Sequence, residues 1–178
     1  MSLIYITGIA GSGKSAIKDE LIKRGYTAFD VDDGTFRLWY NRETDKLAKD
    51  QKTWEEAEAD RTWHEQHWLK VERSRVEGLH QQSMQNSRPI FLTGTTPNDK
   101  DIWDLFDKVI FLRVGDKTLK HRIITRTNNS YGKHPDDLKA ILEWNKDAEA
   151  LNKERGALVV NAEQALHKVV EDILELSD

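Results

Sequence analysis

Five short, mostly apolar runs alternate along the chain with longer segments whose apolar residues recur every three or four positions. Short apolar runs without an alternating polar pattern are typical of strands buried on both faces. The first run is rich in Ile and aromatic residues and is bounded by Gly8, which favours a strand that ends there. The predicted strands span residues 3–7, 26–29, 89–93, 108–114 and 157–161.

Helical patterns fill the intervals between these runs. After the first strand, Ile17, Leu21 and Ile22 share one helical face, and Gly25 provides a stop signal. The predicted helices span residues 14–24, about 53–85, 116–126, 136–154 and 163–176. Strands that alternate with helices predict an α/β fold, in which a mainly parallel sheet is covered on both faces.

The bulk composition narrows the possible functions. A chain of 178 residues fits a single domain with a full core. Its formal charge of -4 argues against a nucleic-acid polymer as partner, because no overall basic field attracts phosphate backbones. The chain has no cysteine, which excludes disulfides, thiolate metal sites and cysteine nucleophiles. No run approaches the roughly 20 apolar residues that span a bilayer, so we expect no membrane partner and a cytoplasmic location.

The segment between the first strand and the first helix carries a phosphate-binding pattern. Gly8, Gly13, Lys14 and Ser15 satisfy G-x-x-x-x-G-K-[ST], with a strand before and a helix after. Glycines let backbone N–H groups approach phosphate oxygens, and the helix start adds unpaired donors. The alternative is a Gly-rich turn with an incidental lysine. The residues predicted to bind ATP here are Gly8, Ala10, Gly11, Ser12, Gly13, Lys14, Ser15 and Ala16.

Lys14 is expected to reach the β and γ phosphates and to act in catalysis, and the Ser15 hydroxyl is expected to hold Mg²⁺. ATP and Mg²⁺ are therefore the predicted cofactors.

Two acids follow the second predicted strand. Residues two apart at a strand end share a face, so Asp30 and Asp32 point to the same side and Val31 packs away. The carboxyl ends of parallel strands are where open sheets bind ligands. One carboxylate can address the metal, and the other can orient a hydroxyl or accept its proton. The alternative is that these acids, with Asp33, only form a turn and cap the next element.

Two other nucleotide-binding classes fit the sequence less well. Neither the strand at 89–93 nor that at 108–114 ends in the acid that a Walker-B motif requires. The guanine-recognition tetrad is also not offered, because Asn145 and Lys146 are followed directly by Asp147. A GTPase or a motor ATPase is thus disfavoured.

The segments "GIAGSGKS", "AFDVDD", "FLTGTT" and "HRIITRTNNSYGK" resemble the small P-loop kinase family that includes shikimate, gluconate and nucleoside monophosphate kinases. This resemblance implies a three-layer P-loop fold with a five-stranded parallel sheet in the order 2-3-1-4-5. It also implies a single kinase domain over residues 1–178. An acceptor-binding helical insertion is expected at about 33–86 and a movable flap at about 127–135.

The resemblance also implies roles for single residues. It makes Asp30 an outer-shell metal acid and Asp32 the catalytic carboxylate that binds the acceptor hydroxyl. Arg122 and Arg126 lie four residues apart on one helical face, where the resembling kinases stack an arginine on adenine and clamp the transferring phosphate. A solvated basic face is the alternative. Asn161 ends the last strand, where these kinases contact the adenine edge, although it equally resembles a helix cap.

Further residues are candidates for the acceptor pocket. Gly94 and Thr95 follow the third strand where shikimate kinase has glycines, and the added hydroxyls and bulk indicate a different pocket. Other acceptor-binding candidates are Asp32, Asp33, Arg37 and Arg61. The tryptophans between the second and third strands fit either a core or a pocket lining. His64 and His67 are separated by two residues, whereas the zinc motif H-E-x-x-H has three between its histidines, and no third ligand is evident nearby. A surface or packing role is therefore preferred.

The sequence thus predicts an ATP- and Mg²⁺-dependent kinase that transfers the γ-phosphoryl group to the hydroxyl of an unidentified small molecule. Two alternatives stay open. One is a nucleoside or nucleotide kinase. The acceptor group of a nucleotide kinase is itself a phosphate, which requires surrounding arginines, and Arg37, Arg42 and Arg61 are available. A regulator that binds ATP without catalysis is the other alternative.

Overall fold

The computed structural model describes residues 1–127 and 131–177. Its centre is a five-stranded sheet in the order β2-β5-β1-β6-β7, and each neighbouring pair is parallel. Counted along the main sheet alone, this is the predicted order 2-3-1-4-5, so the predicted α/β fold is confirmed. The strands are β1 Leu3–Thr7, β2 Thr27–Asp30, β5 Ile90–Thr93, β6 Lys108–Arg113 and β7 Leu158–Asn161, each within one residue of its predicted ends.

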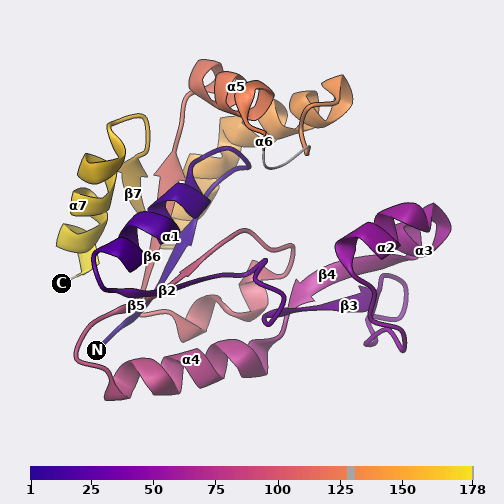
Figure 1. Cartoon of the computed structure of the whole chain (residues 1–178), viewed down its shortest axis with the longest axis horizontal. Coiled ribbons are helices and arrows are strands. Elements are labelled where there is room, and N and C mark those ends of the chain that lie inside the picture. The colour runs from indigo at the N-terminus through magenta and orange to yellow at the C-terminus, as the bar shows by residue number, and fades with distance from the viewer. Residues whose placement is uncertain (128–130, 178) are drawn as a thin grey trace.

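Helices cover both faces of this sheet (Figure 1). The first helix packs against the last and against β2, whereas α6 packs against β6 and β7. Two short 3-10 turns at residues 99–101 and 103–105 lead into β6. The helices that belong to the main layers are α1 Lys14–Lys23, α4 Arg73–Gln85, α5 Asp116–Thr125, α6 Pro135–Glu154 and α7 Leu166–Ser177.

The central strand β1 is deeply buried. Leu3, Ile4, Tyr5 and Ile6 have no exposed surface, which explains why this run carries no alternating polar residues. Tyr5 stacks on Phe106, two residues before β6, with ring centroids 4.8 Å apart. Because β1 has strands on both sides and helices on both faces, the loop that follows it is fixed in position at the carboxyl edge of the sheet.

The insertion between β2 and β5 differs from the sequence prediction. The single helical pattern expected at about 53–85 is divided into α2 Trp54–Ala59, α3 Arg61–Gln66, a strand β4 His67–Val71, and α4. This strand pairs antiparallel with β3 Arg37–Asn41, which the sequence did not predict, and forms a second sheet of two strands. Pairing between distant segments has overridden the local helical pattern at residues 67–71, which are mostly bulky residues that also suit a strand.

The two-stranded sheet lies to the side of the main sheet (Figure 1). It has a small hydrophobic core of its own. Trp39 is 2% exposed and stacks on Trp54 with centroids 6.1 Å apart, while Trp63 meets it edge-on at 5.2 Å. His67 stacks on Trp63 with centroids 3.9 Å apart. The aromatic residues therefore serve mainly as the core of this insertion, one of the two roles that the sequence allowed.

Among the described residues, no helix is both long enough and apolar enough to span a membrane.

Candidate active site

The phosphate loop lies between β1 and α1 at the carboxyl edge of the sheet. Gly11 and Gly13 have φ values of 87° and 103°, a region that residues with a side chain rarely adopt. A Cβ on Gly11 would lie 2.9 Å from Ile123 of α5, so this glycine also allows close packing. No side chain caps the start of α1 at Gly13, and its first backbone N–H groups are thus available to an anion.

Lys14 is held inside this loop. Its Nζ donates hydrogen bonds to the carbonyl of Gly8 at 2.6 Å and to that of Ile9 at 3.1 Å. Burial lowers the pKa of the Lys14 ammonium to about 8, and the charges of Asp30 and Asp32 oppose that shift. Ser15 follows on the exposed side of α1. The predicted phosphate-binding residues thus share one loop, in which Ala10 packs partly against the core and Ala16 is exposed.

Asp30 ends β2 and is 8% exposed. Its Oδ2 accepts a hydrogen bond from the Thr93 hydroxyl at 2.9 Å, and its Oδ1 accepts one from the Asp32 backbone N–H at 2.9 Å. Thr93 lies directly opposite Asp30 because β2 and β5 are parallel neighbours. The sequence placed Asp30 and Thr93 at the ends of predicted strands but did not predict the hydrogen bond between them.

Asp32 turns toward Arg37, the first residue of β3. One guanidinium nitrogen of Arg37 pairs with Asp32 Oδ1, and the other donates to the Thr95 carbonyl. The Asp32 side chain is 69% exposed, so its carboxylate is open to a ligand. Although its surface is exposed, the Asp32 carboxyl is partly desolvated by the surrounding protein, which raises its pKa; the charge of Arg37 lowers this pKa and that of Asp30 raises it.

The loop after β5 joins the acidic residues to the phosphate loop. The Thr95 hydroxyl donates to the Gly8 carbonyl at 2.7 Å, the same oxygen that accepts from Lys14. Gly94 has a φ of 150°, and a Cβ there would lie 2.1 Å from Val31 Cγ2. Its lack of a side chain is thus needed for packing between β5 and the turn after β2.

Two predicted arginines lie over the other side of the phosphate loop. Arg122 donates to the Ser12 carbonyl at 3.2 Å and to the Ala162 carbonyl at 2.8 Å, so it links the phosphate loop to the end of β7. Arg126 donates to the Tyr131 carbonyl, and burial lowers the pKa of its guanidinium. The charge of Arg126 lowers the pKa of the Lys14 ammonium. Residues 128–130 of the expected flap lie outside the described residues.

Three other predicted residues make mainly local contacts. Asp33 accepts from the Asp30 backbone N–H at 2.9 Å and lies 3.4 Å from Lys18 Nζ, as in a turn. The Arg61 side chain is 89% exposed and pairs with Glu65 on its own helix. Asn161 accepts from the Glu163 N–H at 3.2 Å, which is the cap-like role that the sequence also allowed.

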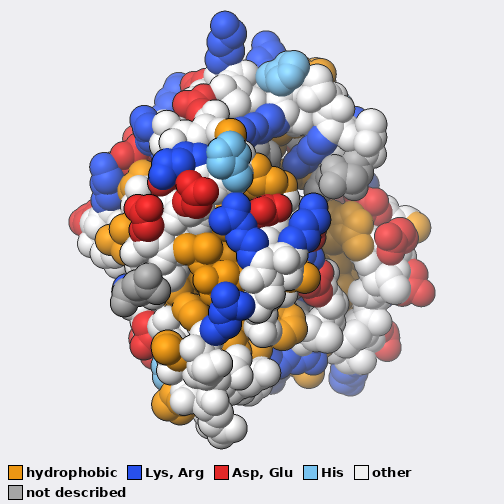
Figure 2. Space-filling view, turned by 60° about the vertical axis from the view of Figure 1, so that its left-hand side comes forward, with side chains coloured by type: hydrophobic (Ala, Val, Ile, Leu, Met, Phe, Trp, Pro, Cys, Tyr) orange, Lys and Arg blue, Asp and Glu red, His pale blue; other side chains and the backbone are white. Residues whose placement is uncertain are grey.

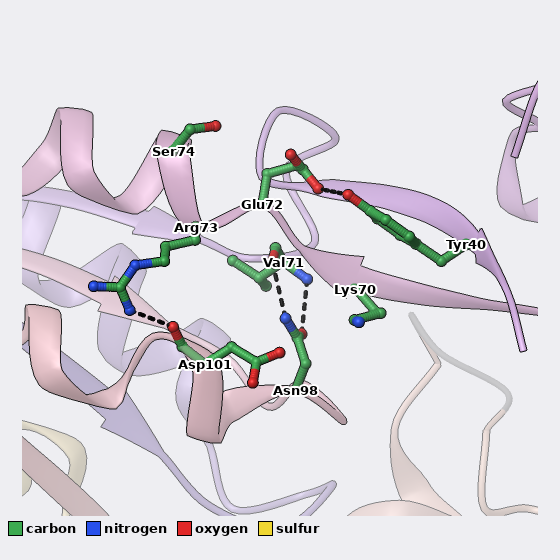
Figure 3. Close-up of a pocket in the computed structure, with 8 residues that line it drawn as sticks. All are labelled: Tyr40, Lys70, Val71, Glu72, Arg73, Ser74, Asn98 and Asp101. Atoms are coloured by element: carbon green, nitrogen blue, oxygen red, sulfur yellow. Dashed lines mark hydrogen bonds between the residues drawn. The ribbon is translucent and has the colours of Figure 1, made fainter. Parts of the chain in front are cut away.

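Two surface concavities of about 260 Å³ lie elsewhere. Figure 3 shows the first. There the side-chain amide of Asn98 forms hydrogen bonds with the backbone N–H and carbonyl of Val71, and the Tyr40 hydroxyl donates a hydrogen bond to the Glu72 carboxylate. The second lies where β6 ends. Among the described residues, the phosphate loop lines neither of them. On the face shown in Figure 2, basic, acidic and apolar side chains are interspersed.

Fold and site together define a P-loop protein of the small-kinase type, which confirms the resemblance found in the sequence. A family model described as AAA domain matches residues 4–169, and the chain belongs to this family. No curated protein sequence matches the chain.

Three solved structures with a similar fold are distant from this chain in sequence. Shikimate kinase from Acinetobacter baumannii in complex with shikimate is 14% identical at a TM-score of 0.59, covering 99% of this chain and 92% of that one. Deoxyadenosine kinase from M. mycoides with bound dATP is 20% identical at 0.57, covering 98% of both chains. A gluconokinase from Sinorhizobium meliloti 1021 is 17% identical at 0.55, covering 99% and 93%.

Proposed function

We propose that this protein is an ATP- and Mg²⁺-dependent kinase that transfers the γ-phosphoryl group of ATP to the hydroxyl of a small molecule. The observation that carries the proposal is the position of Asp32. Its exposed carboxylate is joined through Arg37 and Thr95 to Gly8 of the phosphate loop. This chain of contacts supports a role for Asp32 as the proton acceptor near the terminal phosphate.

The nucleotide is proposed to bind along the phosphate loop and the start of α1. Backbone N–H groups of residues 8–16 would hold the phosphates, and the Lys14 ammonium would leave the loop carbonyls for the β and γ phosphates. Arg122 would contact the adenine side, near Asn161 at the end of β7. Arg126, whose charge already acts on Lys14, would neutralise charge on the transferring phosphoryl group.

The residues available for Mg²⁺ have suitable chemistry. Ser15 is an exposed residue with a hydroxyl group, and the negative charge of the Asp30 carboxylate raises the pKa of the Lys14 ammonium. Hydroxyl and carboxylate oxygens are the hard ligands that Mg²⁺ prefers, and the ion commonly keeps several waters. We therefore propose that Ser15 binds the ion directly and Asp30 through water. The ion would supply neutralisation of phosphate charge.

In the proposed reaction, the oxygen of the acceptor hydroxyl forms a bond to the γ phosphorus of ATP, and Asp32 accepts the proton of that hydroxyl. The bond from that phosphorus to the bridging oxygen of ADP breaks, and the electron pair leaves with ADP. Asp33, Gly94 and Thr95 are proposed to bound the acceptor pocket, and Arg61 to reach its outer edge. A hydroxyl acceptor is favoured over a phosphate, because Arg37 is already paired with Asp32.

Hydroxyl acceptors include nucleosides as well as sugars and other polyols, so a nucleoside kinase lies within this proposal. A nucleotide kinase would instead need arginines that are free to bind the acceptor phosphate. We expect the enzyme to act in the cytoplasm, where ATP is abundant.

The proposal is tested by an ADP-release screen with grouped polyols, sugar acids, nucleosides and nucleotides. With the acceptor found, Asp32→Asn should lower kcat by about two to four orders of magnitude, the usual effect of a lost general base, and leave Mg-ATP binding nearly unchanged. The control is Asp45→Asn, because Asp45 is a similarly exposed carboxylate, paired with Lys70 at the far end of the insertion. Binding of ATP without transfer to any group would support the regulator instead.

A further inference from the structure

Arg37 occupies an unusual position for a residue expected to bind the acceptor. Its side chain is only 16% exposed, although it is a long cationic residue at the start of a two-stranded sheet. Both terminal nitrogens are engaged, one with the Asp32 carboxylate and the other with the Thr95 carbonyl. Its Nε is buried and has no hydrogen-bond partner within the described part of the chain. The guanidinium therefore faces the protein more than the solvent.

The contacts of Arg37 form part of a continuous network. Thr95, whose carbonyl accepts from Arg37, uses its hydroxyl to donate to the Gly8 carbonyl at 2.7 Å. The same Gly8 oxygen accepts from Lys14 Nζ at 2.6 Å. Four hydrogen-bonded or ionic links thus connect the Asp32 carboxylate to the Lys14 ammonium. The proposed proton acceptor and the proposed phosphate ligand are parts of one polar network.

The backbone that carries Arg37 is itself fixed. Arg37 pairs with Val71 across the antiparallel ladder, and the Phe36 carbonyl accepts from the Glu72 N–H at 2.8 Å. The Asn98 side-chain amide accepts a hydrogen bond from the Val71 N–H at 2.9 Å and donates one to the Val71 carbonyl at 3.0 Å. A side chain that extends from such an anchored position can hold its partner within narrow limits.

We propose that Arg37 is a positioning residue, which fixes the Asp32 carboxylate relative to the phosphate loop by bridging it to Thr95. This inference rests on the proposed function and extends it, because it assigns Arg37 a role through Asp32 rather than a direct contact with the acceptor. The planar guanidinium suits this role, since its rigid fork can engage two acceptors at once, whereas a lysine offers a single point charge.

The test compares Arg37→Ala and Arg37→Lys with the wild type. We expect Arg37→Ala to lower kcat for transfer about 100-fold, the effect of a misplaced reacting group, with KM for ATP changed less than about threefold. Arg37→Lys should recover only part of kcat, because a lysine offers a single point charge instead of a rigid fork. Arg88→Ala is the control, because Arg88 lies next to the amino end of β5 and contacts Tyr26 and Gly25.

An unchanged kcat in folded Arg37→Ala would overturn the inference. A higher acceptor KM with normal kcat would also overturn it, since that result indicates a direct acceptor contact.

A second measurement needs no acceptor. Crystal structures of the wild type and of Arg37→Ala compare the position of the Asp32 carboxylate relative to Gly8. We expect the carboxylate to be displaced in Arg37→Ala, and an unchanged position would contradict the inference. If the wild type transfers phosphate to no acceptor while the carboxylate is displaced in Arg37→Ala, the proposed function fails and the Asp32–Arg37 link stands.

Discussion

Gly94 illustrates how a single residue near the site is constrained by packing rather than by a ligand. It donates its N–H to the Ile6 carbonyl at 3.0 Å, and the turn after β2 leaves no room for a Cβ. A matched glycine in the same chain lacks these constraints. Gly78 lies within α4, where an added Cβ would meet nothing within 4 Å.

We predict opposite effects of alanine at these two glycines. Gly94→Ala should lower the free energy of unfolding by about 2–4 kcal/mol, because it combines a strained φ with overlap against Val31. Gly78→Ala should raise it by about 0.5–1 kcal/mol, since alanine is favoured over glycine in a helix. Urea denaturation of both variants checks this. A Gly94→Ala protein as stable as the wild type would show that the turn after β2 adjusts freely.

Lys14 should give a distinct dependence of stability on pH. Its pKa is about 8 in the folded protein and 10.5 in the reference state, so between these pH values the unfolded chain binds the proton and the folded protein does not. The stability contribution of Lys14 therefore rises with pH across this window.

The expected result is that the stability difference between wild type and Lys14→Met shifts in favour of the wild type from pH 7 to pH 9.5. Denaturation of both proteins at the two pH values measures it, and the subtraction removes the effect of other titrating groups. Mg-ATP affinity of the wild type should fall above about pH 8, whereas Lys14→Met should bind weakly throughout.

At the scale of elements, one buried side-chain amide helps to attach the two-stranded sheet to the main domain. Asn98 lies in the loop after β5 and is 8% exposed. It bonds both backbone groups of Val71 in β4, and it also accepts from the Thr96 hydroxyl at 2.7 Å. The end of β4, the partner of Arg37, is therefore held to the main domain by polar contacts as well as by chain connectivity.

Asn98→Ala should destabilise the protein by about 2–3 kcal/mol, because it leaves the buried groups of Val71 without partners. It should also expose residues 33–72 to proteolysis. A comparison variant is Thr53→Ala, which removes the capping box of α2 in the same insertion and should cost about 1 kcal/mol. Equal proteolysis of both variants would contradict a special role for Asn98.

At the scale of the whole molecule, nucleotide binding should draw together parts that are distant in sequence. Arg122 of α5 already connects the phosphate loop, at Ser12, with the segment after β7, at Ala162. A nucleotide that binds between the phosphate loop and the segment after β7 would stabilise several elements at once. The domain assignment predicts that they respond as one cooperative unit.

Mg-ATP at 100 times its Kd should raise the free energy of unfolding by about 2.7 kcal/mol in a single transition. Arg122→Ala should weaken the binding of ATP and ADP alike, since it is proposed to contact the adenine side rather than the γ phosphate. Thermal shifts with ATP, ADP and inorganic triphosphate measure this. Loss of triphosphate binding to the same degree would assign Arg122 to the phosphates instead.

The sequence by itself determined the main sheet and the phosphate loop. Continuous apolar runs such as residues 3–7 have one favourable environment, between two helical layers, so their length and order indicated the fold. The phosphate loop was equally readable, because its glycines, lysine and serine act within one short segment. The positions of Asp30 at the end of β2 and of Asp32 just after it were readable for the same reason, since both lie in one short segment.

Only the tertiary structure decided the second sheet and the partners of Asp32. Residues 37–41 and 67–71 are strands because they pair with each other, and neither has a clear pattern when read alone. Arg37 meets the Thr95 carbonyl across 58 positions in sequence. Local periodicity carries no information about such contacts, since they depend on how distant segments are brought together by the packing of the whole chain.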